Sequence, residues 1–177
     1  MTVMDLEAYK RAYPGWLEAN RHLLEAANWK EAMAGFPFAV NTESPWTPFT
    51  GDLKSRKLAL LSTAGVYLPG EHKPFDAENI EGDWTYREIP VGTDLSRTAL
   101  AHTHYPHTHA DADRNSVFPL DRLRELSAAG TIGPLAPRHY SISGYCTRLE
   151  RVVEEALPAI VAAMQEDGVE MVLHIPV

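Results

Sequence analysis

Apolar residues repeat at helical intervals over the first 35 residues of the chain. The stripe after Pro14 consists of Trp16, Leu17, Leu23, Leu24, Ala27 and Met33. Because proline suits the first turn of a helix, Pro14 predicts the start of a new helix, and Gly35 predicts its end. Periodicity is lost over residues 36–53, where prolines intervene, so we expect an irregular loop there.

Short apolar runs alternate with helical stripes along the rest of the chain. Strands are predicted at residues 57–63, 85–89, 98–102, 139–143 and 170–175, and helices at 119–130 and 147–167. Pro158 predicts a kink in the last helix. This alternation is typical of a three-layer α/β domain with a mostly parallel sheet. We expect a helical segment and proline-rich loop over residues 1–56 and the α/β domain over 57–177, within one structural domain overall.

The composition is that of an ordinary globular domain, with 45% hydrophobic and 23% charged residues among 177. A formal net charge of −8 repels phosphate backbones and anionic lipids, which argues against nucleic-acid and membrane partners. No apolar run approaches the roughly 20 residues that span a bilayer, and residues 1–11 lack the apolar core of a secretory signal. The single cysteine, Cys146, precludes an internal disulfide. Together these features predict a cytoplasmic protein.

Ligands of parallel α/β sheets bind beyond the carboxyl ends of the strands. Thr63, Ala64 and Gly65 follow the first predicted strand, and such a turn can cradle a carboxylate or phosphate with its backbone N–H groups. An ordinary tight turn explains the same residues equally well. The chain has no glycine-rich dinucleotide motif and no P-loop, so a nucleotide is not indicated.

Half of the eight histidines of the chain lie between residues 102 and 109. The histidine segment carries His102, His104, His107, His109, Asp111 and Asp113. If residues 98–104 are extended, His102 and His104 project from one face and can share a metal ion such as zinc, iron, nickel or copper. The same groups suit proton transfer near neutral pH. A polar loop stabilised by its own hydrogen bonds is the third interpretation.

Arg138 and His139 lie at the beginning of a predicted strand. The Arg138 guanidinium can hold a substrate carboxylate through two hydrogen bonds, or it can form a structural ion pair. Cys146 lies between a strand and a helix, and a helix N-terminus would lower its thiol pKa. Most single cysteines are instead buried small apolar groups, so we expect Cys146 to be unreactive.

Five segments occur in an order that resembles a known enzyme family. They cover residues 60–66, 82–90, 102–113, 117–126 and 133–145. Together they are similar to the substrate-specific B component of glycine/sarcosine/betaine reductase and to the related D-proline reductase subunits. The resemblance implies a Rossmann-like α/β fold. It also implies an oxidoreductase, or a subunit of one, that cleaves a C–N bond of a small amino acid or amine, with a thioredoxin-like protein restoring the reduced nucleophile.

On this interpretation a histidine protonates the departing amine. The expected catalytic residues are His104, His109 and Asp111. The expected substrate-binding residues are Thr63, Ala64, Gly65, Arg138 and His139. The chain has Pro106 and His109 where the family has aspartate, so its loop is richer in histidine. The family's selenocysteine or cysteine directly follows the last strand, and no selenocysteine stands in this chain. Because UGA encodes selenocysteine, we expect an in-frame UGA codon after Val177.

Two alternatives remain open. The first is a metal-dependent hydrolase or lyase, in which a divalent transition metal activates water. Its expected ligands are His102, His104, His107 and Asp111. The second is a non-catalytic relative that binds its ligand without a redox step. Trp46 and Phe49, in the proline-rich loop, suit a subunit contact and hence a homo-oligomer.

Overall fold

The computed structural model describes residues 5–41, 43 and 47–177 of the chain. The chain divides into two compact units, Met1–Thr50 and Gly51–Val177. None of the helices in the described part of the chain is long and apolar enough to cross a membrane. Of the two aromatic residues expected at a subunit contact, Trp46 lies outside the described residues and Phe49 is exposed.

The first unit is helical. It consists of α1 (Leu6–Glu25), α2 (Trp29–Ala32) and the 3₁₀ turn η1 (Met33–Gly35). One face of α1 buries Tyr9, Tyr13 and Trp16, whose spacing is that of an apolar helix face. The prediction that Pro14 begins a new helix is wrong, because α1 runs through it. The Pro14 side chain is exposed, and the stacked aromatic rings on the buried face hold both halves of the helix in one register.

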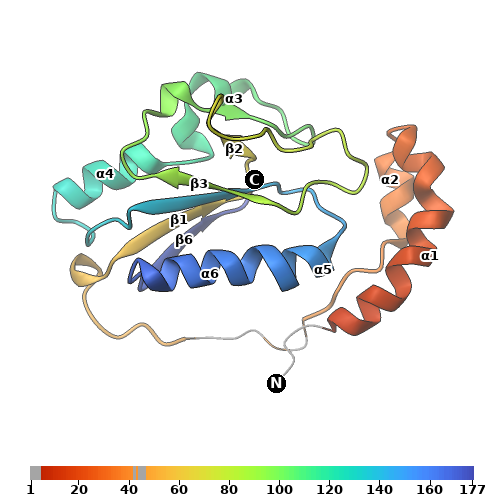
Figure 1. Ribbon diagram of the computed structural model, residues 1–177, viewed down its shortest axis with the longest axis horizontal. Coiled ribbons are helices and arrows are strands. Elements are labelled where there is room, and N and C mark those ends of the chain that lie inside the picture. Colours follow the sequence, from red (N-terminus) through yellow and green to blue (C-terminus); the bar gives the residue numbers. More distant parts are fainter. Residues whose placement is uncertain (1–4, 42, 44–46) are drawn as a thin grey trace. The chain divides into compact units, whose positions relative to one another are not determined.

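The second unit contains a four-stranded sheet with the order β3-β5-β1-β6 (Figure 1). Its strands are β1 (Leu58–Ser62), β3 (Tyr86–Pro90), β5 (Arg138–Ile142) and β6 (Met171–Ile175). Three of them, β5, β1 and β6, are parallel, and only β3 runs antiparallel to its neighbour. The sheet confirms four of the predicted strands and the α/β class.

Helices cover both faces of this sheet (Figure 1). On one face, α4 (Leu120–Ala128) contributes Leu120 and Leu123 to a core that contains Leu60 of β1. On the other face, α6 (Leu157–Glu166) contributes Ile160 to a core that contains Ala59. Successive residues of β1 therefore enter opposite cores, which explains why the apolar run is unbroken.

The helix predicted over residues 147–167 is present but irregular. It begins as α5 (Leu149–Arg151), passes through a π-helical turn, η5 (Val152–Ala156), and continues as α6. Pro158 lies in the first turn of α6, immediately after the widened turn. A proline ring clashes with the carbonyl one turn earlier, and the widened turn relieves that clash.

The strand predicted at residues 98–102 is much shorter in the structure. Only β4 (Ala99–Leu100) forms, and it pairs with β2 (Val66–Tyr67) in a separate two-stranded sheet. The condition under which His102 and His104 would share one face, an extended chain over residues 98–104, is not met, because the Ala101 N–H donates to the Gly65 carbonyl (2.9 Å) and the chain then bends. The histidine segment ends in a short helix, α3 (Thr108–Ala112). The remaining 3₁₀ turns are η2 (Leu53–Ser55), η3 (Leu95–Arg97) and η4 (Arg114–Ser116).

Candidate functional site

The carboxyl ends of β1, β5 and β6 meet at one edge of the sheet. We call this region, marked by Thr63, Gly144 and Val177, the carboxyl edge. The Thr63 N–H donates to the Ile175 carbonyl (3.1 Å), and the Val177 N–H donates to the Thr63 hydroxyl (2.8 Å). These bonds join the segments that follow β1 and β6, so the edge is a defined surface.

Residues 63–65 do not provide the predicted backbone cradle for an anion. The N–H groups of Thr63 and Gly65 donate to strand carbonyls, and the Ala64 N–H donates to Ser62 Oγ (3.2 Å). Gly65 has a φ of +69°, and a Cβ there would lie 2.6 Å from the Ala101 carbonyl oxygen. The role of this turn is therefore to let the chain before His102 pack closely against the carboxyl edge.

His102 is the buried imidazole of the carboxyl edge and is only 6% exposed. Its Nδ1 accepts a hydrogen bond from the His104 N–H (3.1 Å), so the proton of the neutral ring is on Nε2. That Nε2 has no hydrogen-bond partner among the described residues, and a Cβ on Gly144 would lie 3.2 Å from it. Burial, together with His104 and His107, lowers the pKa of His102 to about 4. At neutral pH, the neutral His102 ring therefore carries a buried N–H that donates to no group in the described part of the chain.

Aromatic rings surround His102. The His104 ring stacks on Tyr145, with 4.0 Å between centroids and 17° between planes. The Tyr105 ring lies 4.8 Å from His102, and its hydroxyl donates to the Ala64 carbonyl (3.0 Å). Burial lowers the pKa of His104 and raises that of Tyr105 to about 12. His102 is therefore buried among aromatic rings, where a hydrogen bond to a charged ligand is strong, whereas His104 is exposed beside it.

The structure does not bring Arg138 to the carboxyl edge. Arg138 begins β5, so it lies at the opposite end of the strand, which we call the amino edge. Its guanidinium donates two hydrogen bonds to the Asp167 carboxylate (2.8 and 2.9 Å) and pairs with Glu166 (3.3 Å). The Asp167 hydrogen bonds raise the pKa of Arg138 above its ordinary value. The carboxylates that Arg138 holds are the protein's own.

His139 is enclosed within the sheet. Its Nδ1 accepts a hydrogen bond from the Leu60 N–H (3.0 Å), so the side chain replaces a main-chain carbonyl between β1 and β5. Burial, with a smaller contribution from Arg124, lowers the pKa of His139 to about 4. His139 is fully buried, so it is a residue of the core and does not lie at the carboxyl edge.

The predicted metal site is not assembled. Within the described ranges, no group of three or more His, Cys, Asp or Glu side chains is placed to hold a metal ion. The chain bends at residues 103–105, and the rings of His102 and His104 are nearly perpendicular, with their centroids 5.7 Å apart. His109 and Asp111 are exposed on α3, and Asp111 faces Arg114 at 3.5 Å.

Cys146 follows β5 but is poorly suited to nucleophilic attack. Burial raises the pKa of its thiol to about 11, so the thiol stays protonated at neutral pH. Its low reactivity remains a prediction. Tyr105 and Tyr145 were not predicted as site residues. The available signals were the position of Tyr105 inside the histidine segment and the position of Tyr145 directly after a strand.

Comparison with known proteins gives concordant matches. The model of the family "glycine/sarcosine/betaine reductase selenoprotein B" matches residues 18–175. D-proline reductase subunit gamma of Acetoanaerobium sticklandii is 34% identical over 128 residues, which are 72% of this chain and 51% of that protein. Glycine reductase complex component B subunit gamma of Carboxydothermus hydrogenoformans is 28% identical over 138 residues, 77% of this chain and 32% of that protein. No solved structure matches the chain.

The matched region includes the carboxyl edge as far as residue 175 and the whole histidine segment. The chain spans about half the length of the D-proline reductase subunit and about a third of the glycine reductase subunit. The family model covers most of the chain, which confirms the resemblance noted in the sequence. The chain therefore belongs to the glycine/sarcosine/betaine reductase selenoprotein B family.

Proposed function

We propose that this chain is a substrate-binding part of a reductase of this family, and that it holds the carboxylate of a small amino acid or amine at the carboxyl edge. The observation that carries the proposal is the His102 Nε2–H, which is buried and has no acceptor among the described residues. A buried donor without a partner costs about 1–3 kcal/mol. A ligand carboxylate would accept from it in a charge-assisted hydrogen bond.

Two further considerations support this position for the ligand. Parallel α/β sheets bind ligands beyond the carboxyl ends of their strands, and His102 is held against the ends of β1 and β5. The relatives are named for the reduction of glycine and D-proline, which both carry a carboxylate. We accordingly infer a Rossmann-like arrangement for residues 57–177. Thr63, Ala64 and Gly65 shape the site, while Arg138 and His139 serve the scaffold.

His104 is the proposed proton-transfer group. Its stacked ring lies beside His102, and burial lowers its pKa, so its protonated form is a stronger acid than free imidazolium. In its protonated form such a ring gives a proton to a departing amine, and it returns to the neutral form when it has done so. His109 and Asp111 are exposed on α3 and are the secondary candidates for this role.

Reductive cleavage of a C–N bond also requires a nucleophile and electrons. The raised thiol pKa makes Cys146 a poor candidate, so we propose a selenol or thiol outside the described residues. A thioredoxin-like protein would restore its reduced form. The relatives include subunits of a multi-component complex, which supports protein partners. The poor fit of Cys146 also favours a second function, a ligand-binding component with no redox step of its own.

Ligand binding tests the proposal directly. The isotope-labelled chain is titrated with glycine, D-proline and glycine betaine while the amide resonances of Thr63 and Gly144 are followed. Acetate and methylamine serve as carboxylate-only and amine-only probes. We expect saturable shifts with the three substrates and with acetate, and none with methylamine. Absence of any carboxylate-induced shift at these two amides would contradict the proposal.

Two substitutions of His102 separate its two nitrogens. In His102→Asn, the side-chain oxygen replaces the Nδ1 acceptor and the Nε2–H donor is lost. In His102→Gln, the amide group replaces the Nε2–H donor and the Nδ1 acceptor is lost. We expect His102→Asn to stay folded and to weaken carboxylate binding by about tenfold or more, whereas His102→Gln retains more of the binding. Equal affinity of His102→Asn and the unmodified chain would refute the role of Nε2.

A further inference from the structure

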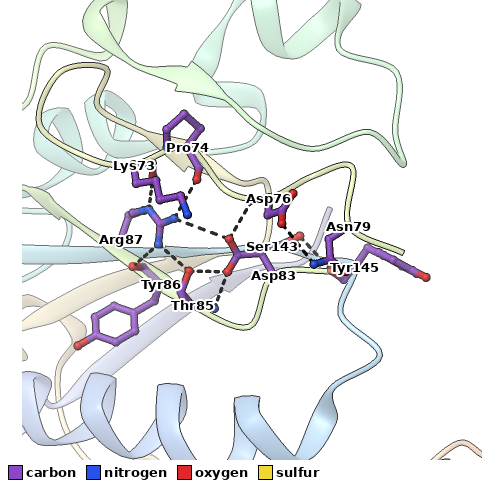
Figure 2. Close-up of polar contacts among 10 residues, drawn as sticks. All are labelled: Lys73, Pro74, Asp76, Asn79, Asp83, Thr85, Tyr86, Arg87, Ser143 and Tyr145. Carbon is purple, nitrogen blue, oxygen red and sulfur yellow. Dashed lines mark hydrogen bonds and ion pairs between the residues drawn. The ribbon is translucent and has the colours of Figure 1, made fainter. Parts of the chain in front are cut away.

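The connection between β2 and β3 contains no helix and no regular strand over residues 71–85, yet one carboxylate holds it together. Asp83 accepts hydrogen bonds from the N–H groups of Asp76 (2.9 Å) and Thr85 (2.7 Å) and from the Thr85 hydroxyl (Figure 2). Burial alone would raise the pKa of Asp83, but these bonds lower it overall. They close residues 73–85 into a compact loop, which we call the strap.

Arg87 fixes the other side of the strap. Its guanidinium donates to the carbonyls of Lys73 (2.8 Å) and Pro74 (3.3 Å) (Figure 2). It also lies 4.1 Å from the centre of the Phe75 ring. It is also 3.8 Å from the Asp83 carboxylate, and both side chains are largely buried. A buried ion pair with this many hydrogen bonds is rigid, and breaking one partner is strongly destabilising.

The strap touches the segment after β5 at Gly82. Gly82 has a φ of +76°, and a Cβ there would lie 2.2 Å from the Tyr145 carbonyl oxygen and 2.7 Å from the Cys146 Cα. Beside this contact, the Tyr145 hydroxyl donates to the Ile80 carbonyl (2.7 Å) and the Thr147 N–H donates to the Glu81 carbonyl (2.9 Å). The strap therefore fixes the Tyr145 ring, which stacks on His104.

The strap also reaches His104 through a second route. The Thr103 hydroxyl donates to the Ala77 carbonyl of the strap (2.9 Å), and the same oxygen lies 3.2 Å from His104 Nδ1. Because the single hydroxyl proton is used by Ala77, the Nδ1–H of His104 donates to the Thr103 oxygen. This arrangement fixes the proton of the neutral His104 ring on Nδ1 and leaves the lone pair on Nε2.

We propose that the strap positions His104: Gly82 fixes the ring through Tyr145, and Ala77 sets the ring tautomer through the Thr103 hydroxyl. This inference rests on the proposed proton-transfer role of His104 for its functional meaning. Thr103, Gly82 and Tyr145 are then positioning residues, because each acts through His104. Precise placement matters, since displacement of a reacting group by about 1 Å can cost about a hundredfold in rate.

The first test compares two glycines of the same connection. Gly82→Ala places a methyl group against Tyr145, whereas Gly70→Ala introduces the same positive-φ strain (φ +84°) with no atom within 4 Å. In wild-type protein, the Tyr145 ring should shift the His104 ring protons upfield in NMR spectra. We expect Gly82→Ala to remove most of this shift and Gly70→Ala to retain it. A folded Gly82→Ala variant that keeps the shift overturns the inference.

The second test uses Thr103, which is exposed, so its substitution leaves the core intact. Nitrogen chemical shifts of His104 report the tautomer. We expect Nδ1–H in wild type, a mixture of tautomers in Thr103→Val, and recovery of Nδ1–H in Thr103→Ser. An unchanged tautomer in Thr103→Val overturns the inference even if Gly82→Ala fails to fold. These readouts need no ligand, so failure of carboxylate binding would reject the proposed function and leave the positioning result standing.

Discussion

The two edges of the sheet treat polar groups in opposite ways. At the amino edge, Arg138 holds Asp167 through two hydrogen bonds, and Lys57 Nζ donates to the Asp167 carbonyl (2.6 Å). At the carboxyl edge and in the adjoining histidine segment, His102 and His107 each have a buried Nε2 without a partner in the described part of the chain. Groups that satisfy one another stabilise a fold, whereas a buried group without a partner needs an explanation. Within β5, His139 Nε2, Tyr140 OH and Ser141 Oγ also lack a partner among the described residues, so the contrast holds between the two edges and does not extend to the core of the sheet.

Acidification should have the largest effect, because it acts on one buried imidazole at the carboxyl edge, His102, and on one in the core of the sheet, His139. His102 and His139 have folded-state pKa values of about 4 against a reference of 6.5, so between these values only the unfolded chain binds their protons. Each histidine therefore makes its full contribution to the free energy of unfolding above pH 6.5. This contribution decreases as the pH falls toward 4, by on the order of 3 kcal/mol for each histidine. The lowered pKa of Asp167, caused by the Arg138 hydrogen bonds, preserves the amino edge until the pH falls below 3.8.

Urea denaturation across this pH window measures the effect. His102→Asn and His139→Asn each remove one titrating ring while keeping an oxygen near the position of Nδ1, so each should flatten the pH dependence. Stability that does not change between pH 6.5 and 4 would contradict the assignment of two buried neutral imidazoles.

Cys146 tests whether the segment after β5 contains a nucleophile. A thiol pKa of about 11 instead of 9 lowers the thiolate fraction at neutral pH by about a hundredfold, so alkylation should be slower than that of free cysteine by about that factor. Mass spectrometry after timed exposure to iodoacetamide gives the rate, with the urea-unfolded chain as the control. Rapid alkylation of the folded protein, with loss of ligand binding, would make Cys146 a functional residue.

Arg138 provides the smallest expected effect and the control for the comparison. Arg138→Gln removes the paired hydrogen bonds to Asp167, so the melting temperature should fall by a few degrees. Carboxylate affinity should stay within about twofold, because distant and independent sites do not couple. Loss of carboxylate binding in a folded Arg138→Gln variant would show that Arg138 contributes to binding. The assignment of binding to the carboxyl edge alone would then be wrong.

The fold was largely predictable because its signals are local. The unbroken apolar run that predicts β1 and the apolar spacing that predicts α4 each involve residues close together in the sequence. Both elements form at the predicted positions. The position of Arg138 at the start of β5 also had a local signal, since parallel strands align their amino ends at one edge. Because Thr63 follows the end of β1 and Arg138 begins β5, this signal indicated that the two residues lie at opposite edges of the sheet.

The arrangement of the candidate site was less predictable because it depends on contacts between distant segments. The hydrogen bond from the Ala101 N–H to the Gly65 carbonyl lies just after β4 and just before His102. The pattern of residues in the histidine segment does not predict this contact. The stacking of His104 on Tyr145 joins residues 41 positions apart (145 − 104). The sequence marked the histidine segment as a candidate site, and the geometry of this segment depends on the strap and on the turn at Gly65.

Direct observation of the His102 ring tests the central claim. Nitrogen-15 NMR of histidine-labelled protein reports which ring nitrogen carries the proton and at which pH the ring titrates. We expect a neutral Nε2–H tautomer that persists down to pH of about 4, with an Nε2–H proton resonance that moves downfield when glycine or acetate is added. An Nδ1–H tautomer, or an Nε2–H resonance unchanged at saturating carboxylate, would contradict the assignment of this donor to the binding of substrate.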